Sequence, residues 1–479
     1  MLYDKLIFEL TSPSRVGHDL KHETNNLNKL PNHLLRENID LPEVTEPDVV
    51  RHYTNVSMKN FGVDTGFYPL GSCTMKYNPK INDQMASLSG FSGLHPLTPN
   101  SASQGALQIL HETDSMLAEI TGMAKFSLAP FEGAQGELTG LMIIKQYHTL
   151  RGDLKRTKII VPDSAHGTNP ASASVAGYEV IEVKSNHDGT VNIESLKELM
   201  SDEVAGIMLT NPNTLGIFEK DILKIREIVH GQGGLLYYDG ANLNALLGHA
   251  KPGNMGFDIV HLNVHKTFST PHGGGGPGAG PVGVTKALIE YLPGPIVVKE
   301  NDEFAFYTPK HSIGRIGTFY GNFSVILRTN SYIKTLGKNN LENVGNFAVL
   351  NANYIKESLK EDYLLPIETV CMHEVVFDGL KDKSTGVKTL DIAKRLLDYG
   401  VHPPTIYFPL LFHEALMVEP VETESKETLD HFISIMRQIA LEAKDNPEIV
   451  KSAPHTTVVG RLDEVLAARQ PRLKFKDIE

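Results

Sequence analysis

The stretch that decides the fold lies between residues 235 and 268, where LLYYDGAN (235–242) is followed by IVHLNVHKTF (259–268). Each segment opens with a short apolar run that is bounded by turn residues, and this length is typical of a buried strand. We therefore predict strands at Leu235–Tyr238 and Ile259–Val264. Their carboxyl ends would carry Asp239 and Lys266.

The same pattern extends outward from these two segments, over residues 104–287. Apolar runs at 158–161, 180–183 and 205–209 alternate with amphipathic stretches such as 222–229. This alternation predicts an α/β fold with a mostly parallel sheet covered by helices. After about residue 329, helix patterns at 389–399 and 426–443 indicate a smaller α+β domain. We expect an N-terminal arm and motif segment at 1–85, a large domain at 86–330 and a small C-terminal domain at 331–479.

The arm is inferred from the first 60 residues, which are polar and poorly periodic. Pro31, Pro42 and Pro47 interrupt any helical or strand pattern there. We therefore expect these residues to wrap around something rather than to form a domain.

Composition excludes several classes of protein. The 479 residues include 45 Lys and Arg against 57 Asp and Glu, a net charge of −12, which disfavours binding to nucleic acids or anionic membranes. No run approaches the roughly 18 apolar residues of a membrane span, and the N-terminus lacks a signal-peptide pattern. The two cysteines, Cys73 and Cys371, form no CxxC pair. A cytoplasmic protein of a reducing compartment is expected.

Four predicted strand ends carry polar residues suited to chemistry, namely His166, Asn211, Asp239 and Lys266. Parallel strands present their carboxyl ends at one edge of a sheet, where open α/β folds bind ligands. The sequence therefore predicts that these residues share one crevice.

Lys266 is the most informative of them. It precedes the glycine-rich PHGGGGPGAGPVG (271–283), which would let the backbone approach a ligand closely. A partly desolvated lysine favours its neutral amine, which suits imine formation. Alternatively, a lysine here could simply mark a solvent-facing strand end.

Asp239 and His166 strengthen the first interpretation. A buried acid needs a partner, and a pyridinium nitrogen whose ring acts as an electron sink is one. Otherwise Asp239 could cap a helix starting near Asn242. His166 could stack on a cofactor ring or be an ordinary loop residue.

A phosphate site is suggested by Gly133-Ala134-Gln135-Gly136. This motif opens a helical pattern, where backbone N–H groups bind phosphate, although a plain glycine turn fits equally well. Together these residues point to pyridoxal phosphate, held as a Schiff base by Lys266.

Competing motifs are weak. GAGPVG (278–283) fits G-x-G-x-x-G but lacks the strand, turn and helix order of a dinucleotide site. His261 and His265 have the spacing of zinc ligands on a helix, but on the predicted strand they would be roughly 13 Å apart. No metal site is expected. Cys73 could be a redox-sensitive thiol or a small buried apolar residue.

Several longer motifs carry a family resemblance. The motifs are YPLGSCTMKYNP (68–79), GAQGELTG (133–140), DSAHGTNPA (163–171), NVHKTF (263–268), FYGNF (319–323), HPPTIYFP (402–409) and EALMVEP (414–420). In this order they resemble the pyridoxal-phosphate subunit of glycine decarboxylase, the P-protein of the glycine cleavage system, over nearly the whole chain from about residue 47.

The resemblance implies the fold of the aspartate-aminotransferase class, with the cofactor in the large domain. It implies glycine as substrate, transfer of the aminomethyl group to the lipoyl arm of the H-protein, and assembly with a companion subunit 1 in an α2β2 complex. Segments 68–78 and 402–409 would grip the substrate carboxylate and shape the lipoyl entrance. The implied site residues are Lys266, Asp239, His166, His265, Ala134, Gln135, Asn211 and Asn242.

Two rival interpretations follow from the same residues. An aminotransferase, an aldolase acting on hydroxy amino acids, or a desulfurase of the same fold would use the same lysine and aspartate. A catalytically degenerate scaffold subunit is the non-enzymatic alternative.

Overall fold

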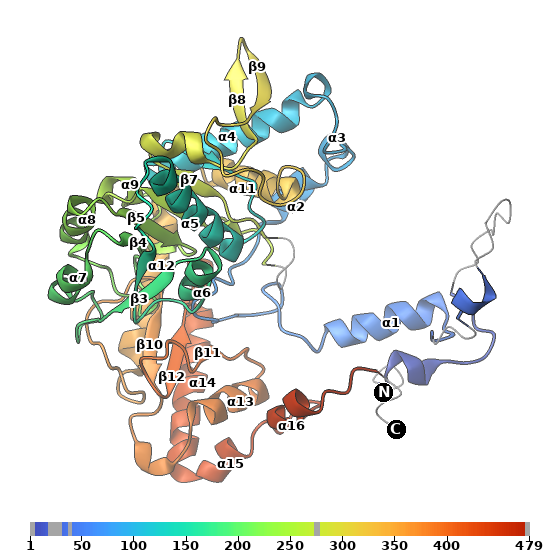
Figure 1. The fold of residues 1–479 in the computed structure, drawn as a ribbon. Helices are drawn as coiled ribbons and strands as arrows, with labels where there is room; N and C mark the ends of the chain where they lie inside the picture. Colours follow the sequence, from blue (N-terminus) through green and yellow to red (C-terminus); the bar gives the residue numbers. More distant parts are fainter. Residues whose placement is uncertain (1–4, 18–30, 37–40, 273–277, 475–479) are drawn as a thin grey trace. The chain divides into compact units, whose positions relative to one another are not determined.

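The computed structural model describes residues 5–17, 31–36, 41–272 and 278–474 (Figure 1). The chain forms two compact units, one of residues 1–66 with 459–479 and the other of residues 67–458. Every predicted site residue lies in the second unit. In the first unit the described helices are η2 (Ile7–Leu10), η3 (Asn32–Leu34), α1 (Glu46–Ser57) and α16 (Glu464–Arg469).

Helix α1 departs from the irregular arm that the sequence predicts. Thr45 caps the helix, and its side chain and that of Asp48 bond reciprocally in a capping box. Pro47 lies in the first turn, where a missing backbone N–H costs no helical hydrogen bond. The proline therefore marks the start of a helix rather than an interruption.

The second unit is built on a seven-stranded sheet in the order β1-β7-β6-β5-β4-β2-β3. Strands β3, β2, β4, β5 and β6 are mutually parallel, and β7 runs antiparallel between β6 and β1. The strands are β1 (Lys125–Ser127), β2 (Lys158–Pro162), β3 (Glu179–Val183), β4 (Val204–Thr210), β5 (Leu235–Gly240), β6 (Ile259–Leu262) and β7 (Val282–Val284). The predicted α/β class and mostly parallel sheet are confirmed.

Alternation along β5 shows how the sheet is buried on both faces. Leu235 and Tyr237 pack into one apolar cluster, and Leu236 and Tyr238 pack into the other. Helices α5 (Gly133–Leu150) and α6 (Thr168–Val175) contribute to the first cluster, whereas α4 (Gln104–Thr121) and α8 (Ile222–Gly231) contribute to the second. Each fully buried aliphatic side chain contributes roughly 1.5–3 kcal/mol. The result is a three-layer α/β/α arrangement (Figure 1).

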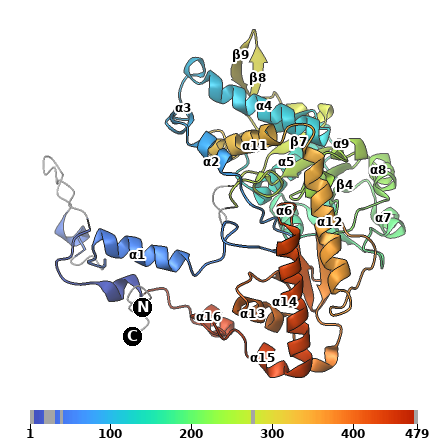
Figure 2. The same ribbon diagram turned by 180° about the vertical axis from the view of Figure 1, so that it is seen from behind.

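The expected C-terminal α+β region is also present. Its antiparallel sheet has the order β10-β12-β11, with β10 (Val375–Asp378), β11 (Thr405–Ile406) and β12 (Ala415–Val418). Helices α12 (Leu341–Leu359), α13 (Thr389–Asp398), α14 (Lys426–Asp445) and α15 (Pro447–Lys451) pack with it around one apolar cluster. Figure 2 shows α12 and α14 side by side. The two helices predicted at 389–399 and 426–443 are confirmed.

The other elements are one projecting hairpin, helix α11 (Phe323–Leu336), which packs on α2 (Lys80–Ala86) and α4, and short helices in the connections. The hairpin consists of β8 (Ile296–Glu300) and β9 (Glu303–Tyr307). The remaining helices are α3 (Ser89–Ser92), η4 (Asn100–Ala102), α7 (Ile193–Leu199), η5 (Asn244–Leu246), α9 (Pro252–Met255), α10 (Val264–Thr267), η6 (Lys286–Tyr291) and η7 (Lys383–Thr385). Among the described helices, none has both the length and the apolar composition needed to cross a bilayer.

Candidate active site

The predicted crevice exists as a cavity of about 280 Å³ at the carboxyl edge of the central sheet. Six of the predicted residues line it, namely Lys266, Asp239, His166, His265, Ala134 and Asn242. The lining also includes residues from distant parts of the sequence that were not singled out, namely Ser72, Glu137, Asn263, His373 and Glu374. Strand ends, a helix start and the C-terminal sheet therefore meet around one cavity, which is large enough for a cofactor.

Lys266 reaches the cavity from a helical turn rather than from a strand end. Strand β6 ends at Leu262, and Lys266 lies in the four-residue helix α10. The Lys266 N–H donates to the Asn263 carbonyl at 2.9 Å, which closes this turn. The prediction that the strand continues through Val264 is wrong, because this residue is fully buried in α10 and so leaves the apolar pattern of the sequence unbroken.

The same correction applies to the spacing of His261 and His265. His261 lies on β6, but His265 lies in α10. The separation deduced from a continuous strand therefore does not describe these two side chains.

The amine of Lys266 is held by a backbone carbonyl. Its Nζ donates to the Ser72 carbonyl oxygen at 2.7 Å. Ser72 has a φ of 62°, a left-handed conformation that is uncommon for a residue with a Cβ atom. Its N–H donates to Oε2 of Glu374 at 2.8 Å, which helps to hold this backbone in place. The hydrogen-bond acceptor of the amine is thus a neutral carbonyl rather than a carboxylate.

Asp239 lies at the end of β5 and is 3% exposed. Its Oδ2 accepts from Asn169 Nδ2 at 2.8 Å, its Oδ1 accepts from the Ala241 N–H at 3.0 Å, and His261 Nε2 lies 3.3 Å from Oδ1. Burial alone would raise the pKa of Asp239, but His261, these hydrogen bonds and Lys266 together hold it below its ordinary value. The ionised form can therefore stabilise a protonated ring nitrogen. The helix that follows, η5, begins at Asn244 with Leu243 as its N-cap, so Asp239 is not its cap.

Glu137 connects Asp239 with His166 and was not singled out from the sequence. Its carboxylate accepts from Thr168 Oγ1 at 2.8 Å and from Ser172 Oγ at 2.9 Å. Oxygen and nitrogen atoms of Glu137, Asp239 and His261 lie within 4.8 Å of one another. Burial and the charge of Asp239 raise the pKa of Glu137 to about 7. The sequence signal was present in GAQGELTG, whose fifth residue is this acid.

His166 is oriented by the same network. Its Nδ1 lies 3.2 Å from the Thr168 N–H, which donates to it, and 2.9 Å from Thr168 Oγ1. Burial, together with the charge of Lys266, lowers the pKa of His166. The neutral form of the ring is therefore favoured, and its centroid lies 5.2 Å from that of the Phe408 ring in an edge-on arrangement.

The start of α5 supplies a cradle for an anion. The first N–H groups of any helix have no intrahelical acceptor and attract negative charge. Gly133 is required there, because a Cβ atom would lie 2.4 Å from Asn263 Oδ1. The buried atoms Asn263 Oδ1 and Thr210 Oγ1 have no hydrogen-bond partner among the described residues, and both residues line the cavity. Together with Lys266 and Asp239, this set fits pyridoxal phosphate.

Two predicted residues, Gln135 and Asn211, do not line the cavity. The side chain of Gln135 is turned to the Phe131 N–H, which donates to its Oε1 at 2.6 Å, while its own backbone N–H, the predicted phosphate donor, lies in the first turn of α5. Asn211 is fully buried, and its Oδ1 accepts from the backbone N–H of Glu219 at 2.9 Å. Both side chains therefore stabilise the backbone beside the site.

Asn242, His265 and Cys73 all line the cavity and make contacts at its wall. Asn242 donates to Thr74 Oγ1 and Glu419 Oε1 at 2.6 and 2.7 Å. His265 packs edge-on to His272 at 4.9 Å, and burial lowers its pKa to about 3. Cys73 Sγ lies 3.0 Å from His272 Nε2, and burial raises the pKa of this thiol. Residues 273–277 of the glycine-rich segment lie outside the described residues.

The two segments predicted to shape the substrate entrance meet each other. The rings of Tyr68 and His402 stack with centroids 3.7 Å apart and an interplanar angle of 22°. This contact joins the motif at 68–79 to the motif at 402–409, which is separated from it by more than 300 positions.

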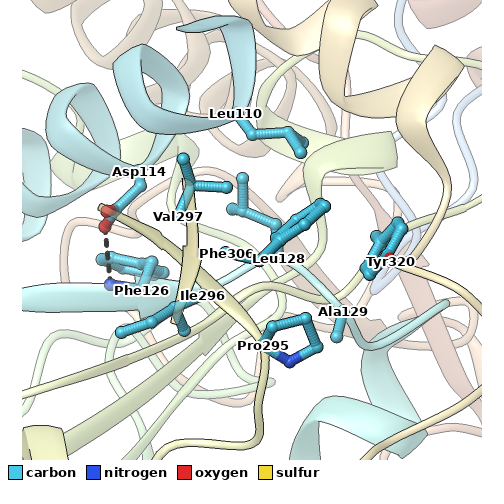
Figure 3. Close-up of a pocket in the computed structure, with 10 residues that line it drawn as sticks. All are labelled: Leu110, Asp114, Phe126, Leu128, Ala129, Pro295, Ile296, Val297, Phe306 and Tyr320. Atoms are coloured by element: carbon cyan, nitrogen blue, oxygen red, sulfur yellow. Dashed lines mark hydrogen bonds between the residues drawn. The ribbon is translucent and has the colours of Figure 1, made fainter. Parts of the chain in front are cut away.

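A second cavity, shown in Figure 3, is too small to compete as a substrate site. It encloses about 20 Å³ and is lined largely by apolar side chains such as Leu110, Leu128 and Val297. The carboxylate of Asp114 at one end accepts from the Phe126 N–H at 2.7 Å. Such a volume holds about one water molecule.

The raised pKa of Glu137 predicts a pH-dependent stability that glutamine should remove. A folded-state pKa of about 7 means that the folded protein holds a proton that the unfolded chain releases. The free energy of unfolding should therefore fall as pH rises from about 4.5 to about 7. We expect Glu137→Gln to reduce this fall, by at most about 3 kcal/mol.

Urea denaturation followed by circular dichroism at about pH 5 and about pH 8 measures this difference. Glu357→Gln is the control, because Glu357 is exposed and its pKa is lowered, mainly by its hydrogen bond with Lys360. An identical pH dependence in wild type and Glu137→Gln would contradict the expected protonation of this carboxyl.

Comparisons with known sequences find close relatives along the whole chain. A protein-family model described as "Glycine cleavage system P-protein" matches residues 15–306, and one described as "Glycine dehydrogenase, C-terminal domain" matches residues 344–457. A probable glycine dehydrogenase (decarboxylating) subunit 2 from Alkaliphilus oremlandii is 58% identical over 99% of both chains. Its counterpart from Caldanaerobacter subterraneus subsp. tengcongensis is 60% identical over 99% of both chains.

Solved structures share the fold. A crystal structure of glycine decarboxylase (P-protein) of the glycine cleavage system, in inhibitor-bound form, has a TM-score of 0.73 at 21% identity and covers 85% of this chain and 93% of its own. An aspartate aminotransferase from Thermus thermophilus has a TM-score of 0.57 at 14% identity over 78% of this chain and 99% of its own. These similarities confirm the fold of the aspartate-aminotransferase class.

Proposed function

The chain belongs to the glycine cleavage system P-protein family, as a glycine dehydrogenase (decarboxylating) subunit 2, and from this premise we propose how it works. It binds pyridoxal phosphate through Lys266 and decarboxylates glycine. The remaining aminomethyl group passes to the lipoyl arm of the H-protein, and a companion subunit 1 completes the enzyme in an α2β2 assembly.

One observation carries the proposal. The same cavity is lined by the amine of Lys266, which is bonded to a neutral carbonyl, and by the buried carboxylate of Asp239. Lys266 Nζ would hold the cofactor as a Schiff base, and Asp239 would keep a proton on its ring nitrogen. When bound, pyridoxal phosphate supplies an electron sink for the bond to the departing carboxylate.

The other residues of the site would bind and orient the cofactor and the substrate. The N–H groups of Gly133, Ala134 and Gln135 at the start of α5 would donate hydrogen bonds to the phosphate, and Asn263 and Thr210 would complete that end of the site. His166 would lie against the cofactor ring, oriented by its contacts with Thr168. The Tyr68 and His402 stack lies where the two entrance segments meet, and these segments would bind the substrate carboxylate and admit the lipoyl arm.

The test is exchange of the carboxyl group of glycine with labelled bicarbonate. It is run with the chain, companion subunit 1 and lipoylated H-protein together, beside a transamination assay with a keto acid. We expect exchange that requires all three proteins and no transamination. Transamination without exchange would instead favour an aminotransferase of the same fold. If added pyridoxal phosphate produces no absorption band of a bound cofactor, a scaffold role is favoured over both.

A further inference from the structure

A second group of titratable side chains borders the cavity and has no role in the function proposed above. His373 and Glu374 immediately precede β10, and Glu419 immediately follows β12. Their exposed fractions are 3%, 2% and 0%. Nitrogen and oxygen atoms of the three side chains lie within 4.8 Å of one another. His373 and Glu374 line the cavity together with Lys266.

The hydrogen bonds of this cluster are incomplete. Glu374 Oε2 accepts from the Ser72 N–H at 2.8 Å. Glu419 Oε1 accepts from Thr74 Oγ1 at 2.6 Å and from Asn242 Nδ2 at 2.7 Å. Among the described residues, Glu419 Oε2 and His373 Nδ1 have no hydrogen-bond partner although both are buried. Buried polar atoms are rarely left unpaired, so a proton or a ligand atom is expected within the cluster.

The charges around the cluster favour a proton. Two carboxylates this close in a dry environment cannot both ionise freely. Burial and mutual repulsion raise the pKa of Glu374 well above its ordinary value, and burial raises that of Glu419 to about 7. His373 does not compensate them, because burial lowers its pKa to about 3. The nearby cations are Lys266 and Lys76, and Lys76 is already paired with Glu422 at 2.6 Å.

We propose that Glu374 and Glu419 together form a proton reservoir for the substrate amine. This inference rests on the proposed function, in which glycine enters the same cavity. Glycine arrives as an ammonium ion, and its nitrogen can replace the Lys266 amine only after losing a proton. Glu374, which faces the cavity, takes that proton as it passes its own to the Glu419 carboxylate.

The proton balance of the carboxyl pair closes within the reaction. The glycine ammonium loses one proton to the carboxyl pair, so the pair becomes neutral. When the aminomethyl carbon forms its bond to one lipoyl sulfur, the sulfur–sulfur bond breaks and its electron pair remains on the other sulfur as a thiolate. The pair returns its proton to that thiolate, which becomes a thiol. The product amine is released neutral when Lys266 replaces it, and it then takes up one proton from solvent, so no external oxidant or reductant is required.

The first test needs neither substrate nor cofactor. Infrared difference spectra of the folded chain at about pH 6 and about pH 8 should show the C=O band of a buried protonated carboxyl, which shifts in D2O. We expect Glu419→Gln and Glu374→Gln to remove or shift this band. Gln Oε1 preserves the acceptors for Thr74, Asn242 and Ser72, so both variants should fold. The band should persist in the surface control Glu357→Gln.

The second test follows the proton itself. Glycine is mixed with the loaded complex in weak buffer, and proton release is followed with an indicator dye. The wild type should release about one proton fewer per site than Glu419→Gln at equal glycine occupancy.

Equal proton release in the wild type and Glu419→Gln would overturn the reservoir, and so would an infrared band that is unchanged in both glutamine variants. Tight binding of zinc chloride that both variants abolish would also overturn it, because a cation would then neutralise the pair. If the complex fails to bind glycine, the proposed function fails, while the infrared band still decides whether the pair holds a proton.

Discussion

Replacing Lys266 with alanine is expected to lower glycine–bicarbonate exchange by at least roughly 10³-fold, the scale on which a central catalytic group acts. The variant loses the only lysine amine in the described lining of the 280 Å³ cavity, and no neighbouring group there can form the imine. Exchange is measured with saturating pyridoxal phosphate, companion subunit 1 and H-protein. Lys286→Ala, an exposed lysine just beyond β7, is the control and should retain its activity.

Lys266→Arg separates charge from nucleophilicity. A guanidinium keeps the positive charge and can still donate to the Ser72 carbonyl, but it forms no imine under these conditions. We therefore expect Lys266→Arg to lose as much exchange as Lys266→Ala. Substantial exchange in the arginine variant would show that the lysine contributes charge rather than covalent attachment.

Asp239→Asn is expected to retain the cofactor but to lose about 10²-fold or more of the exchange rate, the low end of what a proton-positioning group contributes. Asparagine keeps a hydrogen-bonding side chain between Asn169 and the Ala241 N–H. It cannot stabilise a protonated ring nitrogen by charge, so the electron sink weakens. Cofactor content is read from absorbance, and exchange is measured on the same sample.

Asp163→Asn is the matched control for that experiment. Asp163 also follows a strand of the same sheet, but it bonds Ser185 and does not line the cavity. The control should keep exchange within a few-fold of wild type. Near-normal exchange in Asp239→Asn would remove the electronic role of this carboxylate, whereas loss of the cofactor itself would assign Asp239 to binding.

The sheet was predictable because its signal is local. Runs such as 204–210 and 235–240 are almost wholly buried, so they read as continuous apolar segments ending in polar residues. The short helix α10 was not predictable, because its first residue, Val264, continues the apolar run of β6 and its four residues are too few to show a helical period.

Site residues were predictable where they follow strands and not where the topology brings them in. Lys266, Asp239 and His166 stand next to recognisable elements. Ser72 and Glu374 are 302 positions apart and meet only because the C-terminal sheet packs beside the cavity. Asn211 was placed at the correct strand end, but its side chain folds back onto Glu219. The sequence shows which residue follows a strand, but it does not show in which direction the side chain of that residue points.

The most direct measurement is borohydride reduction of the holoenzyme, followed by protease digestion and mass mapping of the modified peptide. We expect a single reduced pyridoxal adduct on Lys266, within the peptide that contains NVHKTF (263–268), and none in Lys266→Ala. An adduct on any other lysine of the wild-type chain, or none at all in a complex that exchanges glycine carboxyl, would contradict the assignment.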